Sequence, residues 1–282
     1  MQEKQIKMKG SGLYTWFGYV YGFEEKLRYI KDAGFDTICT WWDNTFIGID
    51  GDITTHKELA RKHGLFLEHS HISYYGSNNL WFRTDDGDTI KKKHLEVIEL
   101  AGKCDIPTLV MHPFEVVKPD GGDYEVFMDR MCRIAECAEK SRVRIAVENL
   151  GEQEYLRKIV STLSDNPYIG ICFDSGHNNV TNHNDYSLLH DFSDRIFALH
   201  IHDNNSLKDQ HYLPFEGNAD FGKFMEAMRN TSFTGSLMLE SCYPFDFDAA
   251  DTDENHEFSQ PEEPVESYLR RAKEACDRIY SL

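Results

Sequence analysis

The feature that most constrains the fold of this 282-residue chain is an alternation that continues from one end to the other. Short apolar runs rich in β-branched residues alternate with segments whose apolar residues recur every three or four positions. The apolar runs lie near residues 12–15, 35–40, 65–70, 107–111, 143–148, 168–173, 196–201 and 235–240. Strands that alternate with amphipathic helices are typical of parallel βαβ units.

Eight such units predict an α/β fold, a single (β/α)8 TIM barrel that spans residues 1–282. The last helical pattern, from Val265 to Tyr280, would close the outer ring. No repeat, low-complexity tract or Gly/Ser linker divides the chain, which favours one domain. The same alternation leaves an open, doubly wound sheet as the alternative.

Composition restricts the partners of this chain. It contains 30 Lys and Arg residues against 48 Asp and Glu residues, a net charge of −18 that repels polyanions, so we expect no nucleic acid partner. The first twelve residues are polar, and no segment approaches the roughly 18 apolar residues of a membrane span. We therefore expect a cytoplasmic protein with no membrane contact. Seven cysteines, an odd number without a CxxC pair, predict reduced packing thiols.

Histidines and carboxylates stand at the ends of the third to eighth apolar runs. Active sites of barrels are built at the carboxyl ends of strands, so these residues would converge on one rim. In chain order they are His71, His112, Glu148, Asp174 with His177 three residues later, His200 and Glu240.

Imidazoles and carboxylates are ligands for Zn²⁺, Mn²⁺ and related ions, and carboxylates gathered at one rim repel each other unless a cation is present. One such residue alone is more often a loop anchor, but six strands in register favour a metal. We therefore predict a divalent-metal site on four of them: Glu148, Asp174, His200 and Glu240. The others, His71, His112 and His177, are equally compatible with binding substrate or supporting a ligand.

Three further histidines carry less signal. His69 is interpreted as one residue out of phase with the inward-facing positions of its strand, so it is expected to face the other side of the sheet and to serve packing. His63 and His94 fall within helical patterns and are assigned no functional role.

Four ordered motifs resemble those of the xylose-isomerase-like sugar isomerase/epimerase superfamily. They are Glu148-Asn149, Asp174-Ser175-Gly176-His177, His200-Ile201-His202-Asp203-Asn204 and the segment 214–221. The resemblance implies one Mn²⁺, Zn²⁺, Mg²⁺ or Co²⁺ ion on the four predicted ligands, and a sugar or sugar-phosphate substrate that chelates it. The ion would polarise a carbonyl, so that Glu148 and Glu240 could remove and return a proton on the adjacent carbon through an enediolate.

The same resemblance extends to substrate contacts. It implies that Glu154 and His177 hydrogen-bond substrate oxygens, and His71 and His112 are further candidates for substrate binding. For Glu154 the alternative is a carboxylate that is favoured simply because it lies near the start of a helix. Barrels of this superfamily often pair, which leaves a homo-oligomer open.

The loop after the seventh run departs from the ketose epimerases. Where those enzymes carry an arginine, this chain has Asp209-Gln210-His211, followed by Glu216-Gly217-Asn218. This pattern resembles the endonuclease IV branch, whose members use three zinc ions to cleave DNA at abasic sites. On this second interpretation the additional metal ligands would be His71, His112, His177, Asp209 and His211.

We favour the sugar isomerase/epimerase hypothesis. An endonuclease IV-like phosphodiesterase, a metal-dependent dehydratase or lyase on the same scaffold, and a non-catalytic barrel remain open. Segment 246–263 weighs against a DNA substrate, because it contains eight acidic residues and no Lys or Arg. The segment itself is compatible with a solvated loop, a lid or a subunit contact.

Overall fold

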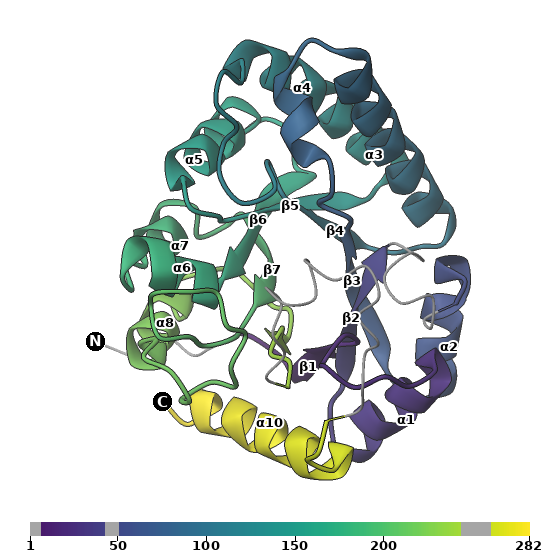
Figure 1. Ribbon diagram of the computed structural model, residues 1–282, viewed down its shortest axis with the longest axis vertical. Coiled ribbons are helices and arrows are strands. Elements are labelled where there is room, and N and C mark those ends of the chain that lie inside the picture. The colour runs from purple at the N-terminus through teal and green to yellow at the C-terminus, as the bar shows by residue number, and fades with distance from the viewer. Residues whose placement is uncertain (1–6, 43–50, 244–260) are drawn as a thin grey trace.

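The computed structural model describes residues 7–42, 51–243 and 261–282, and it shows a ring of strands inside a ring of helices (Figure 1). Most of the acidic segment 246–263 lies outside the described residues. The strands follow the predicted runs closely: β1 Ser11–Tyr14, β2 Thr37–Trp42, β3 Phe66–Ile72, β4 Thr108–Met111, β5 Arg144–Glu148, β6 Ile169–Asp174, β7 Ile196–His200 and β8 Leu237–Leu239.

All strand pairs are parallel, in the order β7-β6-β5-β4-β3-β2-β1-β8. A parallel bridge between Ile201 and Leu239 joins the two ends, and the Ile201 N–H donates to the Met238 carbonyl at 2.9 Å. The sheet therefore closes into the predicted (β/α)8 barrel, and the open doubly wound alternative is wrong.

The helices cover the outside of the barrel. They are α1 Phe23–Asp32, α2 His56–Lys62, α3 Asp85–Lys103, α4 Tyr124–Ser141, α5 Gln153–Thr162, α6 Ser175–Asn182, α7 Ser187–Asp191, α8 Phe221–Met228 and α10 Val265–Tyr280. In α4 an apolar stripe of Phe127, Met131 and Ile134, spaced three and four residues apart, is fully buried. Each such side chain stabilises the fold by about 1.5–3 kcal/mol. No helix in the described ranges is long and apolar enough to cross a membrane.

Strand β3 contains a bulge that decides which of its side chains face inward. Ile38 of β2 pairs with Leu67, but the next residue, Cys39, pairs with His69, so Glu68 is an extra residue. Glu68 accepts a hydrogen bond from the Ser236 N–H at 3.0 Å, across the amino end of the barrel. His69 also faces the interior, and the expectation that it packs on the other side of the sheet is wrong. The reason is that a bulge interrupts the alternation of faces, and that residues two apart, such as 69 and 71, share a face.

Candidate metal centre

Glu148, the last residue of β5, lies at the centre of a cluster of imidazoles. One carboxylate oxygen, Oε2, is 3.1 Å from His71 Nε2 and 3.2 Å from His112 Nε2. The other, Oε1, is 3.1 Å from His200 Nδ1. The Glu148 side chain is only 1% exposed, so these contacts are shielded from water.

Glu240, which follows β8, reaches the same imidazole from another strand. Its Oε2 is 3.0 Å from His200 Nδ1, so Glu148 and Glu240 converge on one nitrogen. Burial alone would raise the pKa of both carboxyls, but the neighbouring imidazoles, His200 foremost, together more than offset this effect. The pKa of Glu148 falls well below its ordinary value, and that of Glu240 falls to about 2. Both side chains are therefore carboxylates at neutral pH.

Asp174 joins the end of β6 to the start of α6. Its Oδ1 accepts a hydrogen bond from the backbone N–H of His177 at 2.6 Å, which caps the helix. Its Oδ2 is 3.0 Å from His202 Nε2. The imidazole of His202 packs directly on Gly176, where an added Cβ would lie 1.9 Å from His202 Cε1. Glycine at position 176 is therefore what allows His202 to reach Asp174.

A second group of ligand-type side chains adjoins the first. Asp209 Oδ2 is 3.0 Å from His211 Nε2 and 3.3 Å from His177 Nε2. Although burial disfavours the charged imidazole, Asp209 raises the pKa of His211 to about 10. The His211 ring stacks on His202 with centroids 4.0 Å apart. We refer to His177, Asp209 and His211 as the annex.

The structure brings together nearly all of the predicted site residues: His71, His112, Glu148, Asp174, His177, His200, Asp209, His211 and Glu240. Glu154 is the exception, because its side chain is 65% exposed and pairs with Lys158 along α5 at 3.8 Å. Two contributors were missed as site residues, His69 and His202. The spacing His200-x-His202 could have indicated His202, because residues two apart on a strand share a face.

The hydrogen bonds of three imidazoles test whether a metal fits this donor set. The Nδ1 atoms of His71, His112 and His211 donate to backbone carbonyls at 2.7, 3.2 and 2.8 Å. When His71 and His112 are neutral, their Nε2 lone pairs then face the Glu148 carboxylate. A cation held by these side chains would offset the repulsion between the lone pairs and the carboxylate, and metal-ligating histidines typically donate their other N–H in this way.

A buried nitrogen without a hydrogen bond also favours a metal site. In the described part of the chain, His177 Nδ1 makes no hydrogen bond, although it lies 3.4 Å from Glu148 Oε1 and 3.6 Å from Asp174 Oδ1. Several triads, including His71-His112-Glu148 and His71-His200-Glu240, have their ligand atoms within 4.8 Å of one another. The residues present therefore fit a divalent metal centre.

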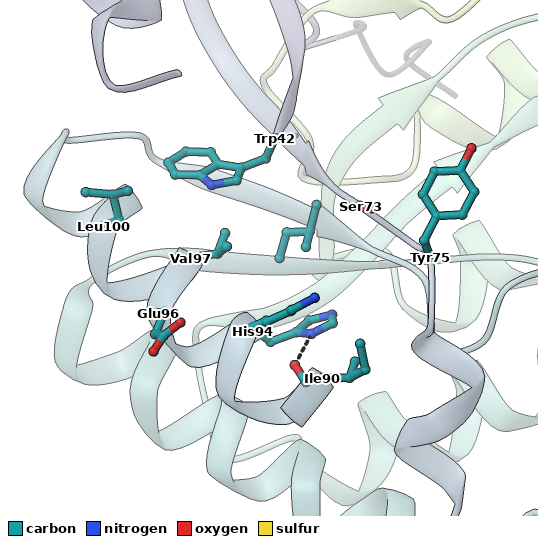
Figure 2. A pocket seen from close by; sticks show the side chains of 10 residues that line it. Trp42, Ser73, Tyr75, Ile90, His94, Glu96, Val97 and Leu100 are labelled. Carbon is teal, nitrogen blue, oxygen red and sulfur yellow. Dashed lines mark hydrogen bonds between the residues drawn. The ribbon is translucent and has the colours of Figure 1, made fainter. Parts of the chain in front are cut away.

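A cavity of about 390 Å³ lies apart from this cluster, between β2, β3 and α3 (Figure 2). Its wall includes Trp42, Val97 and Leu100, and none of the cluster residues lines it. The buried His94 donates its Nδ1 hydrogen to the Ile90 carbonyl of the same helix at 2.9 Å, as Figure 2 shows. Burial lowers the pKa of His94, which keeps it neutral. His94 therefore lies within a helix, as the sequence indicated, and the structure adds that it forms part of the cavity wall.

The closed barrel, with its polar cluster at the carboxyl ends of the strands, defines a (β/α)8 protein whose candidate site lies at the usual end of that fold. The sequence profile of the xylose isomerase-like TIM barrel family matches residues 27–277, and this chain belongs to that family. The uncharacterized protein y4fM of Sinorhizobium fredii is 26% identical, over 79% of this chain and 82% of that one.

Solved structures with the same fold include several sugar epimerases. An L-ribulose 3-epimerase superposes with a TM-score of 0.77 at 14% identity, covering 97% of this chain and 95% of that one. D-psicose 3-epimerase from Clostridium cellulolyticum H10 superposes with a TM-score of 0.73 at 15% identity, covering 96% of this chain and 99% of that one. 3-Keto-D-glucoside 4-epimerase from E. coli superposes with a TM-score of 0.71 at 18% identity, covering 99% of this chain and 100% of that one. At these identities the likeness shows the fold alone.

Proposed function

We propose that this chain is a divalent-metal-dependent sugar isomerase or epimerase that moves a proton on the carbon next to a carbonyl. The observation that carries the proposal is the convergence of Glu148 and Glu240 on His200 Nδ1, at 3.1 and 3.0 Å. They come from β5 and β8, which β6 and β7 separate. Two carboxylates that approach one point from different strands can lie on two faces of a bound substrate. The sugar epimerases that share the fold support the same class of reaction.

The proposed roles follow from the donor set. Glu148, Asp174, His200 and Glu240 would hold Mn²⁺, Zn²⁺, Mg²⁺ or Co²⁺. Such an ion, when bound, supplies Lewis acidity that makes the hydrogen next to a carbonyl easier to remove. Glu148 and Glu240 are ionised, so either can accept that proton and become the neutral acid. For a proton to be returned from the other side, the second carboxylate must first take up a proton from solvent and then donate it to the carbon. If the proton is returned to the same carbon from the opposite face, the configuration of that carbon is inverted and the sugar is epimerised. If the proton is instead moved between neighbouring carbons on a single face, the sugar is isomerised.

Charge at the carboxyl ends of the strands favours an uncharged sugar over a sugar phosphate. In sequence, the segments between each strand and the next helix contain three cationic residues, Arg83, Lys118 and Lys208. The Lys118 ammonium lies over the Trp81 ring, 5.3 Å from its centroid. Phosphate binding generally uses several cationic or N–H donors, and the net charge of −18 opposes it further.

Deuterium uptake from D₂O into a panel of ketoses, each with its phosphate ester, tests the function. We expect uptake by an uncharged ketose in the presence of one of the four metals. Glu148→Gln and Glu240→Gln should each lower the rate about 10²–10⁴-fold, the usual contribution of a general acid or base. Glu68→Gln, which changes a buried glutamate at the other end of the barrel, is the matched control and should keep the rate. Uptake at the full rate in both site variants would contradict the proposal, and analysis of the products would reveal a dehydratase or lyase.

The annex gives specific support to a second candidate, a multi-zinc phosphodiesterase of the endonuclease IV type. His177 and His211 both contact Asp209, and His71 and His112 contact Glu148, so ligands for more than one ion are present. Metal atoms per purified chain distinguish the two functions. A value near one supports the isomerase, whereas a value near three together with cleavage of a phosphodiester would favour the hydrolase.

A further inference from the structure

His69 contacts the proposed metal ligand His200 inside the barrel. It comes from β3, just after the bulge, and its side chain is fully buried. The two Nε2 atoms are 3.2 Å apart, and the ring centroids are 5.3 Å apart. Because β3 and β7 are not neighbours in the sheet, this contact crosses the barrel.

The direction of the His69–His200 hydrogen bond follows from the other nitrogen of His200. His200 Nδ1 faces Glu148 and Glu240, where the proposed metal would bind. A neutral imidazole that uses its Nδ1 lone pair for a metal carries its proton on Nε2. The contact between the Nε2 atoms is then a hydrogen bond only if His69 accepts it, and His69 must carry its own proton on Nδ1.

Sulfur atoms are the competing acceptors. The Sγ atoms of Cys39 and Cys172 each lie within 4.8 Å of a ring nitrogen of His200. Sulfur is a weak acceptor, whereas the unprotonated nitrogen of an imidazole is a strong one. The Cys39 thiol instead points its hydrogen toward the Thr40 carbonyl, with a sulfur–oxygen distance of 3.7 Å. His69 is therefore the better partner for the His200 N–H.

Keeping a histidine at position 69 costs free energy. Its Nδ1 is buried and has no hydrogen-bond partner among the described residues. A side chain that served packing alone would avoid this cost by being apolar, since buried polar groups are normally paired. The unpaired nitrogen indicates that the other nitrogen of the ring is needed.

We propose that His69 is a positioning residue for the metal centre. By accepting the Nε2 hydrogen of His200, it fixes the ring and its tautomer so that the Nδ1 lone pair faces Glu148 and Glu240. This inference rests on the proposed function in one respect, namely that His200 is a metal ligand.

Titration of the metal-free protein with Zn²⁺, Mn²⁺ and Co²⁺ tests this role. His69→Leu should weaken binding about 10–100-fold, the usual effect of removing the hydrogen-bond partner of a metal ligand. His69→Gln, whose amide oxygen can reach the position of Nε2, should retain most of the affinity. Cys39→Ala, which removes the nearby sulfur, should leave it unchanged. Wild-type affinity in His69→Leu overturns the proposal, as does equal weakening in the Leu and Gln variants or weakening in Cys39→Ala.

NMR of the wild-type protein with ¹⁵N-labelled histidine and bound Zn²⁺ gives a readout that is independent of activity and of mutant folding. We expect His69 to carry its proton on Nδ1 and to have an unprotonated Nε2. A proton on His69 Nε2 overturns the proposal even if His69→Leu does not fold. A wild-type chain that binds none of the three metals contradicts the metal centre itself and, with it, the proposed function. Wild-type binding that is insensitive to position 69 contradicts only the role of His69.

Discussion

The two ends of the barrel each contain a buried glutamate, and the two behave oppositely. At the amino end, burial raises the pKa of Glu68, and its hydrogen bond to Ser236 only partly offsets that effect. At the carboxyl end, Glu148 is buried even more completely, yet the imidazoles around it hold its pKa well below the ordinary value. Burial alone therefore does not distinguish the two residues. What differs is the number of groups nearby that can carry positive charge.

The surroundings of Glu68 fit a structural role. A cavity of about 360 Å³ at this end is lined by Phe66, Arg144 and Phe197 together with Glu68. The Arg144 guanidinium lies over the Phe197 ring, 5.2 Å from its centroid, rather than against the carboxylate. A carboxyl in this setting fits a role in supporting the fold, whereas the ionised carboxyl of Glu148 fits the cation site that we propose.

The largest effect expected from this comparison is on metal binding. Glu148→Gln removes the carboxylate that His71, His112 and His200 share, so Zn²⁺ affinity should fall by more than about 100-fold, beyond the usual effect of a supporting residue. Calorimetric titration with Zn²⁺ measures it. An equal loss of Zn²⁺ affinity in Glu148→Gln and Glu68→Gln would contradict the distinction between the two ends of the barrel.

Two glycines, one near each end of the barrel, allow a matched pair of alanine substitutions. Their expected effects are smaller than that of Glu148→Gln. A Cβ at Gly176 would strike His202, and a Cβ at Gly170 would lie 2.5 Å from the Arg195 carbonyl oxygen. Each alanine variant should lose about 1–3 kcal/mol of unfolding free energy in urea, the usual cost of overpacking. Only Gly176→Ala should also weaken Zn²⁺ binding, because His202 holds Asp174. Weaker binding in Gly170→Ala as well would show that the metal site responds to general strain.

The unfolding free energy of the metal-free protein should depend on pH through the titratable groups at the carboxyl end of the barrel. His211 has its pKa raised from 6.5 to about 10, so its stabilising contribution is complete below pH 6.5 and is lost as the pH rises toward 10. Glu240 has its pKa lowered from 4.5 to about 2, so its contribution is complete above pH 4.5 and is lost as the pH falls toward 2.

Urea unfolding of the metal-free chain across this range should therefore show the greatest contribution of these two groups between pH 4.5 and 6.5. His211→Asn should flatten the alkaline decline while leaving the acid limb in place. An unchanged alkaline limb in that variant would exclude His211 as its source.

The smallest effect is expected at Glu68. Glutamine keeps an acceptor for the Ser236 N–H and carries no charge into the buried site, so unfolding free energy at pH 7 should change by less than about 1 kcal/mol. Glu68→Ala should cost more, about 1–3 kcal/mol, because the Ser236 N–H is left unpaired. A Glu68→Gln variant that unfolds much more easily at pH 7 would indicate that the ionised carboxylate is needed.

Much of this architecture could be predicted from the sequence. The apolar runs located every strand, and the residue after each run located the cluster, because parallel strands all end at the same rim. The direction of single side chains and the register of the strands were harder to predict. Glu154 has the expected spacing from Glu148, but spacing does not determine which way a residue on α5 points, and it is exposed beside Lys158. His69 was misplaced because it lies after the bulge, in regular register with His71, and residues two apart on a regular strand share a face.

The bulge in β3 also affects how this chain should be compared with its relatives. Because Glu68 is an extra residue, loss of one codon at this point would shift the strand by one position without altering any other amino acid. A relative with a regular β3 would then need a one-residue gap opposite Glu68, and an ungapped alignment would pair each inward side chain with an outward one. The presence of His69 in other family members should therefore be judged from strand register and not from column identity.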